Sequence, residues 1–167
     1  MLKGPKPGLK IGSLNARGKT VTTRSGSDRN KIKLIMKWMS KHKIAILALI
    51  DTHWDEPIAE TIKQTYRNHQ ILHSNESTNC GGVAFVIDER IAKIGSINFN
   101  ILIPGRTAEL EVTYENQKIH LVTVYVPNEK KEKISVIKRL RKVMEKMENK
   151  SDLVLTRDFN MAECEID

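Results

Sequence analysis

A carboxylate and a carboxamide stand two residues apart near the end of the sequence, directly after an apolar run. Residues 153–156 are typical of a buried strand, and Asp158 and Asn160 follow them. Because residues i and i+2 of an extended chain point to the same side, both side chains can share one point in space. A hard cation, a phosphate group or an activated water molecule would suit such a point. A strand that ends in an ordinary Asp/Asn turn is the plainer alternative.

Three earlier strand-like segments also end in a polar residue. These residues are Asn15, Asp51 and Tyr125, and each follows a run that is apolar or alternates in polarity. Sheets that are covered by helices place their binding sites at strand ends. We therefore expect these three side chains to converge with Asp158 and Asn160 on one cleft.

The rest of the pattern predicts the elements that hold these strand ends. Strands are predicted over residues 9–15, 44–50, 70–73, 82–87, 110–114, 119–125 and 152–156. Helices are predicted around residues 32–39, 55–66 and 131–149, from apolar residues at helical spacing. The apolar stripe expected on the last helix is Ile134, Ile137, Leu140, Val143, Met144 and Met147. Strands and helices in this order predict a layered α/β or α+β domain.

The composition is typical of one soluble, intracellular domain. The chain has 167 residues, and no apolar run approaches the length that crosses a membrane. The basic residues 1–8 are expected to form a tail, because no signal-peptide core follows them. Cys80 and Cys164 are too few for a disulfide scaffold and lack zinc-site spacing. The net charge of +8 favours a polyanionic partner such as nucleic acid, although solubility alone would also explain it.

Five short motifs, taken in order, resemble the endonuclease/exonuclease/phosphatase superfamily. They are Ser-Leu-Asn-Ala-Arg-Gly (13–18), Leu-Ile-Asp-Thr-His-Trp (49–54), Gly-Gly-Val-Ala-Phe-Val (81–86), Val-Tyr-Val-Pro-Asn (124–128) and Asp-Phe-Asn (158–160). The best match is the apurinic-endonuclease-like nuclease of LINE-type (non-LTR) retrotransposons, and the resemblance covers nearly the whole chain. It implies a four-layer α/β sandwich that nicks DNA phosphodiesters with Mg²⁺, or with Mn²⁺ as the alternative ion.

The resemblance also implies a role for each strand-end residue. Asp51 stands at the position of a metal-binding Glu, and Asn15 would lie near the metal. Tyr125 would lie close to the scissile phosphate, Asp158 would activate the attacking water, and Asn160 would hold the phosphate in the transition state. The chemistry independently requires such a set, because a phosphodiester transition state gathers negative charge that a cation, an amide and a phenol can stabilise.

Departures from the family pattern predict weakened catalysis. Asp51 is one methylene shorter than the Glu of the family, and Arg157 replaces a glycine before Asp-Phe-Asn. The family's C-terminal part, with a further Asp and a Ser-Asp-His motif that carries the catalytic His, has no match here. Residues 9–167 are therefore expected to be a truncated domain. His53 and His120 are expected to be structural or surface residues.

Three functions stay open on the sequence alone. The first is a nuclear DNA endonuclease domain, impaired as a fragment, with a reverse transcriptase domain in a longer parent chain. The second is a non-catalytic remnant that binds nucleic acid weakly, and the third is a phosphatase of the same superfamily. Expected nucleic-acid contacts are Arg17, Lys138, Arg141 and Lys142, although a helix face rich in charge is also typical of a solvated surface.

Overall fold

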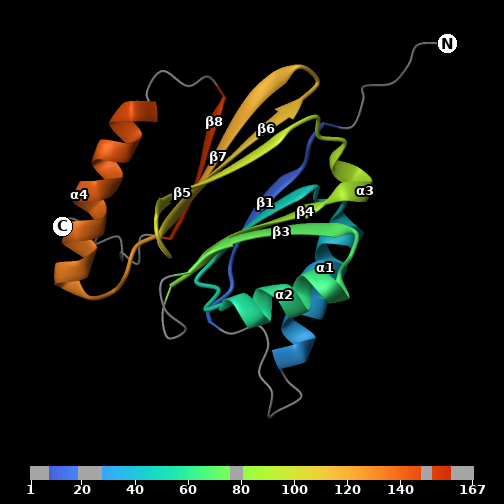
Figure 1. Cartoon of the computed structure of the whole chain (residues 1–167), viewed down its shortest axis with the longest axis horizontal. Coiled ribbons are helices and arrows are strands. Elements are labelled where there is room, and N and C mark those ends of the chain that lie inside the picture. Colours follow the sequence, from blue (N-terminus) through green and yellow to red (C-terminus); the bar gives the residue numbers. More distant parts are fainter. Residues whose placement is uncertain (1–7, 19–27, 76–80, 148–151, 159–167) are drawn as a thin grey trace, which may run out of the picture.

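Two four-stranded sheets pack face to face in the computed structural model, which describes residues 8–18, 28–75, 81–147 and 152–158 (Figure 1). The first sheet has the order β1 (Ile11–Asn15), β2 (Ile46–Ile50), β4 (Val83–Asp88) and β3 (His69–Ser74). The second has the order β5 (Ile97–Ile103), β6 (Thr107–Tyr114), β7 (Gln117–Tyr125) and β8 (Leu153–Asp158). The helices are α1 (Asp28–His42), α2 (Glu56–Thr65), α3 (Glu89–Ala92) and α4 (Lys130–Met147). The predicted four-layer α/β sandwich is confirmed, with α1 and α2 outside the first sheet and α4 outside the second.

Strand β2 is an inner strand of the first sheet and is buried on both faces. All five of its residues are buried, because the sheet interface covers one face and helices α1 and α2 cover the other. Ile46, Ala48 and Ile50 face the second sheet, whereas Leu47 and Leu49 face the helices. Burial on both faces explains the uninterrupted apolar run in the sequence.

Helix α2 begins where its sequence predicts. Asp55 is the N-cap, and its Oδ1 accepts a hydrogen bond from the Ile58 backbone N–H at 2.9 Å. Pro57 lies in the first turn, where no helical partner for its nitrogen is needed. Helix α2 therefore starts a few residues after β2, and it fixes the path of the intervening segment that carries Asp51.

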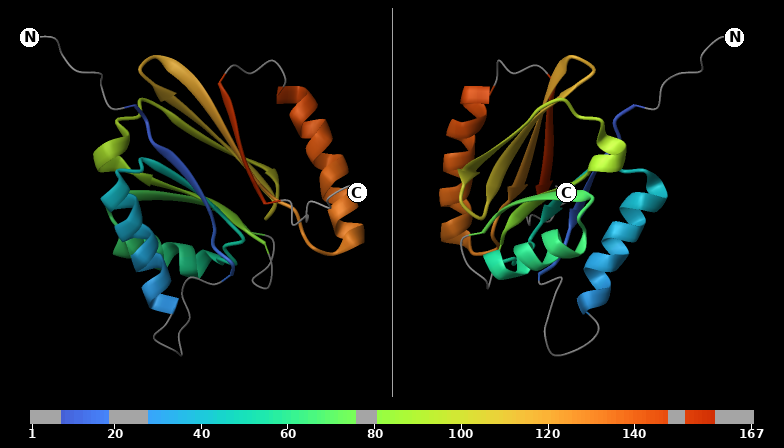
Figure 2. Two further views of the ribbon diagram at one scale, coloured as in Figure 1. Left: turned by 180° about the vertical axis from the view of Figure 1, so that it is seen from behind. Right: turned by 45° about the vertical axis from the view of Figure 1, so that its right-hand side comes forward.

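One edge strand of each sheet, β1 of the first and β8 of the second, lies on the same side of the molecule (Figure 2, left). Each runs parallel to its only neighbour, β1 to β2 and β8 to β7. Val154 and Leu155 of β8 are each 39% exposed. The prediction that residues 153–156 form a buried strand is therefore wrong, because a strand at the edge of a sheet has a neighbour on one side alone.

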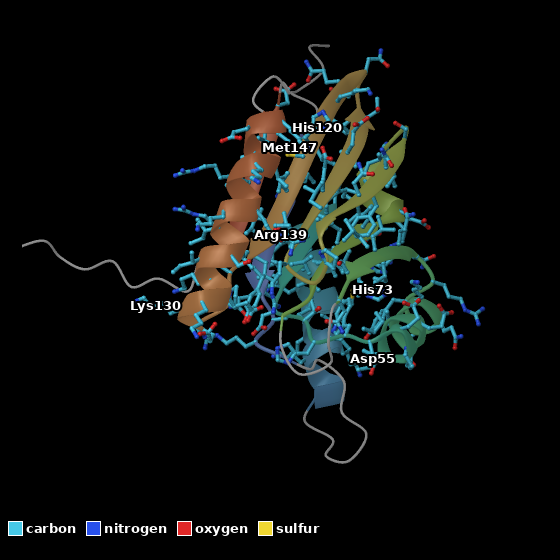
Figure 3. All side chains as sticks on the ribbon, turned by 60° about the vertical axis from the view of Figure 1, so that its left-hand side comes forward. Asp55, His73, His120, Lys130, Arg139 and Met147 are labelled. Carbon is cyan, nitrogen blue, oxygen red and sulfur yellow. The ribbon has the colours of Figure 1, made fainter. Side chains whose placement is uncertain are left out.

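The predicted apolar stripe of helix α4 is correct for Leu140, Val143, Met144 and Met147, which pack on the second sheet, and wrong for Ile134 and Ile137. Val136, Leu140 and Met147 are buried against the sheet, whereas Ile134 and Ile137 are 47% and 37% exposed. The predicted stripe spanned a wider arc of the helix than the sheet covers. Figure 3 shows that Met147, at one end of α4, lies near His120. Lys130 is at the opposite end of the helix.

His120 is a structural residue in the described part of the chain, as expected. It lies on the same face of β7 as Val122 and Val124, which α4 covers. Its ring is buried, and Nδ1 lies 2.8 Å from Oε1 of Glu109, which is also buried.

In the described residues, no helix is both long and apolar enough to span a bilayer.

Candidate functional site

Asn15 and Asp51 lie at the same end of the first sheet, where strands β1 and β2 end. Asn15 pairs in register with Ile50, the last residue of β2. The two segments stay bonded beyond the strands, since Gly18 N donates to the Asp51 carbonyl oxygen at 2.8 Å. The Asn15 side chain closes a turn by accepting a hydrogen bond from Arg17 N at 2.7 Å. The parallel pairing of β1 and β2 thus places two of the five predicted site residues side by side.

The Asp51 carboxylate has two polar partners. Its Oδ1 lies 2.8 Å from Nε2 of His53 and accepts a hydrogen bond from Gly81 N at 3.2 Å. The Asp51 side chain is 19% exposed and that of His53 is 20% exposed. His53 is therefore a neighbour of the predicted metal ligand, a position that the sequence reasoning did not assign to it.

Three non-glycine residues around this site, Arg17, Asp51 and His53, have positive φ, and so do Gly18, Gly81 and Gly82, for which this conformation is not strained. A non-glycine residue in this conformation costs about 1–3 kcal/mol and persists only where its surroundings hold it in place. Such strain is common at functional sites, so the segment after β2 is a candidate site on conformation as well as on residue type.

Tyr125 lies at the end of β7 beside a buried cation that the sequence reasoning missed. Its backbone N–H donates to the Arg106 carbonyl oxygen at 2.7 Å, and Arg106 Cζ lies 5.3 Å from the centre of its ring. Arg106 is only 4% exposed. Its guanidinium also forms an ion pair with Glu132 in the first turn of α4, with Nε 3.1 Å from Oε1.

Gly81 connects this cation to the Asp51 side of the site. A Cβ at Gly81 would lie 1.8 Å from Nη1 of Arg106, so the guanidinium packs directly on the glycine backbone. The same residue donates its N–H to Asp51. Gly82 N donates to the Gly105 carbonyl oxygen at 2.9 Å, which joins the two sheets at this end. Asp51 and Tyr125 therefore lie at one end of the sandwich, linked through Gly81 and Arg106.

Asp158 is placed by the backbone of β8 alone. Strand β8 is parallel to β7, and Asp158 is the register partner of Tyr125. The end of β8 thus lies at the same end of the second sheet as the end of β7. Asn160 lies outside the described residues, and so does the side chain of Asp158.

The predicted nucleic-acid contacts lie in two places. Arg17 is exposed beside the Asn15 turn. Lys138, Arg141 and Lys142 are exposed on the face of α4 that points away from the second sheet, where they border a surface pocket with Ile134 and Ile137. Because Glu132 pairs with Arg106, the first turn of α4 is the part of this helix nearest to Tyr125.

A divalent cation fits the donor chemistry at the end of β2, although the described residues hold no cluster of three or more His, Cys, Asp or Glu ligands. Mg²⁺ is usually held by one or two carboxylates and keeps several water molecules. Asp51 supplies a partly exposed carboxylate, and Asn15 lies on the neighbouring strand. These two residues would hold the ion, together with water and substrate oxygens.

Comparison with known proteins gives structural neighbours and no sequence relatives. The sequence matches no protein-family model and no curated protein. TDP2 of D. rerio, solved with a single-strand DNA product, has a TM-score of 0.66 and 15% identity; the match covers 93% of this chain and 62% of that chain. The endonuclease domain of TRAS1, a telomere-specific non-LTR retrotransposon, has a TM-score of 0.60 and 13% identity over 93% of this chain and 61% of that chain.

A third structural neighbour is a bacterial phosphatase. The mannosyl-6-phosphatase Bt3783 of Bacteroides thetaiotaomicron has a TM-score of 0.62 and 14% identity over 92% of this chain and 66% of that chain. The chain thus spans less than two thirds of the length of these neighbours. Nucleases and phosphatases of one architecture are represented among them. The chain has the fold of the endonuclease/exonuclease/phosphatase superfamily.

Proposed function

We propose that this chain is a metal-dependent phosphodiesterase domain that acts on DNA, is derived from a retrotransposon endonuclease and is catalytically impaired. The observation that carries the proposal is the link from Asp51 through Gly81 and Arg106 to Tyr125, at one end of this fold. Neighbours with this fold include a retrotransposon endonuclease domain and a protein solved with a DNA product. A nuclear location and a reverse transcriptase domain in a longer parent chain belong to the same proposal.

The proposed roles follow from the chemistry of each side chain. Asp51 and Asn15 hold a Mg²⁺ or Mn²⁺ ion, which neutralises charge on the phosphate when it is bound. The Tyr125 hydroxyl donates a hydrogen bond to a phosphate oxygen, and the Asn160 amide does the same. The Asp158 carboxylate aligns the attacking water and accepts its proton.

The basic face of α4 supplies nonspecific attraction to the DNA backbone in this proposal. Each neutralised phosphate steepens the salt dependence of binding, so these contacts can be counted by titrating salt. Lys138→Ala with Lys142→Ala should weaken binding and flatten its salt dependence. Lys33→Ala with Lys37→Ala on α1 is the charge-matched control and should change both much less. Equal effects of the two double variants would show that net charge alone attracts DNA.

A nicking assay tests the impaired state. General acid–base groups contribute about 10²–10⁴ in rate, and the chain has no match to the motif that carries the catalytic His. We expect the chain with Mg²⁺ to nick supercoiled plasmid no more than the background rate. The Asp158→Ala variant should give the same result. Metal-dependent nicking that Asp158→Ala abolishes would show that the chain is an active endonuclease.

A binding assay tests the phosphodiester site itself. A short fluorescein-labelled single-stranded DNA is titrated with the chain in Mg²⁺, and binding is followed by fluorescence anisotropy. Asp51→Ala and Tyr125→Phe should each weaken binding, and chelation of the metal should remove the effect of Asp51→Ala. Binding that neither substitution changes would leave only the noncatalytic, charge-driven function.

The second candidate is a phosphatase of the same fold. The mannosyl-6-phosphatase neighbour favours it, because that protein shares the architecture at a TM-score of 0.62. A small phosphomonoester offered beside the plasmid separates the two. Metal-dependent release of phosphate from the monoester would assign the chain to this second candidate.

A further inference from the structure

We infer that Arg106 is a positioning residue of the proposed site, which orients Tyr125 and ties it to the segment that carries Asp51. The inference rests on the proposed function. It adds Arg106 to the site residues that were predicted at the strand ends. Arg106 is 4% exposed, so its charge lies almost wholly inside the protein. A buried charge needs partners, because desolvation of an unpaired charge is very costly.

The first partner of Arg106 is the ring of Tyr125. The guanidinium carbon lies 5.3 Å from the ring centre, within the range of an attractive cation–π contact. The Arg106 carbonyl oxygen also accepts the Tyr125 N–H at 2.7 Å. Side chain and backbone of one residue therefore hold both the ring and the main chain of Tyr125, which restricts where its hydroxyl can point.

The second partner is Glu132, which holds the guanidinium from the side of α4. Arg106 Nε lies 3.1 Å from Oε1 of Glu132, and a second guanidinium nitrogen bonds to the same oxygen. Glu132 is the more exposed member of the pair, at 41% for its side chain. The planar guanidinium thus has a fixed orientation between the helix and the strand.

The third contact is with Gly81, and it reaches the other sheet. Arg106 Nη1 would lie 1.8 Å from a Cβ at this position, so no other residue leaves room for the guanidinium there. Gly81 donates its N–H to Asp51. Movement of Arg106 would therefore be transmitted to the proposed metal ligand as well as to Tyr125.

A double-mutant cycle in the DNA-binding assay separates positioning from general support of the fold. If Arg106 acts mainly through the Tyr125 hydroxyl, which it reaches by direct contact with the ring, most of the effect of its removal disappears when that hydroxyl is absent. We expect Tyr125→Phe to weaken Mg²⁺-dependent DNA binding about tenfold, the loss of one hydrogen bond to a charged group. Arg106→Met alone should weaken binding by a similar factor. Added to the Tyr125→Phe variant, it should weaken binding by less than about a further twofold.

Two further variants complete the design. Arg106→Lys keeps a cation near the ring but not the planar guanidinium, so it should restore only part of the binding that Arg106→Met loses. Glu132→Gln keeps the guanidinium and removes its ionic partner, so it should give a smaller loss that also vanishes in combination with Tyr125→Phe. It is the variant to use in the cycle if Arg106→Met does not fold, as judged by thermal unfolding.

The outcomes distinguish the inference from the proposed function. Additive losses for the Arg106 and Tyr125 substitutions would overturn the inference alone, because they would mean direct contact with DNA or general destabilisation. If neither Tyr125→Phe nor Asp51→Ala weakens binding, the proposed phosphodiester site is wrong and the inference falls with it. Loss with Tyr125→Phe and no loss with Arg106→Met would also overturn the inference.

Discussion

Gly82 offers the sharpest test of how the two sheets are joined beside the candidate site. Its φ is +91°, and a Cβ there would lie 2.5 Å from Oγ1 of Thr52 and 3.2 Å from the backbone nitrogen of His53. Thr52 is 1% exposed and β-branched, so its side chain cannot easily rotate away. Gly82→Ala therefore imposes both an unfavourable backbone conformation and a steric overlap.

The magnitude follows from these two contributions. The positive φ costs an alanine about 1–2 kcal/mol, and overpacking in a filled interior costs about 1–3 kcal/mol. Together they lower the free energy of unfolding by about 2–5 kcal/mol, a large part of the roughly 5–15 kcal/mol of a typical domain. With a urea dependence of about 1–3 kcal/mol per molar, the unfolding midpoint should fall by at least about 0.7 M.

Urea unfolding followed by tryptophan fluorescence measures this effect, because Trp54 is fully buried close to the site. Gly95→Ala is the matched control, since its nearest contact would be an ordinary 3.6 Å to the Thr113 carbonyl oxygen and it should change stability by less than about 0.5 kcal/mol. Thr52→Ala combined with Gly82→Ala should recover the steric part of the loss. A Gly82→Ala midpoint equal to that of Gly95→Ala would refute the reasoning.

Three other perturbations have clear directions. Asp51→Glu should strengthen Mg²⁺ or Mn²⁺ binding by restoring the reach of the carboxylate; equal or weaker binding by calorimetric titration would count against the proposed role. Burial lowers the pKa of His69 below its ordinary 6.5 even though the nearby Asp88 carboxylate opposes this, so folding favours the neutral ring. The contribution of His69 to stability should therefore be full above pH 6.5 and fall as the pH drops through the lowered pKa, and His69→Gln should flatten this decline in urea midpoints. Association of the chain at raised concentration should be relieved by Val154→Lys on the edge strand β8; light scattering that shows a stable monomer before substitution would contradict this.

Local sequence patterns account for most of the elements and for the order in which they end. The apolar run around β2, the Asp55 cap with Pro57, and the polar turn between β6 and β7 all have local causes, and the structure has these elements near their predicted positions. Strand β5 was missed, although Ile97 and Phe99 alternate with asparagines and pack against the core between the sheets. Local periodicity records which residues share a face, and that is enough to define most elements.

Arg106 marks the limit of that reasoning at the site. Its sequence context, after Pro104 and Gly105, is typical of an exposed turn. The hairpin register could have found it, because extending the β6–β7 pairing by one residue beyond Thr107 and Val124 sets Arg106 opposite Tyr125. Its ion pair with Glu132 and its contact with Gly81 had no such indication, since both depend on how α4 and the first sheet pack.

The packing of elements against one another also sets which apolar residues are covered. Ile134 and Ile137 fit a helical stripe as well as Val136 does, and Val154 has the sequence context of a core residue in a strand. Helix α4 meets the sheet along one narrow line, and β8 has a neighbour on one side alone, so these residues stay exposed. Spacing along a chain fixes the direction of a side chain relative to its own element, whereas burial depends on whether another element occupies that direction.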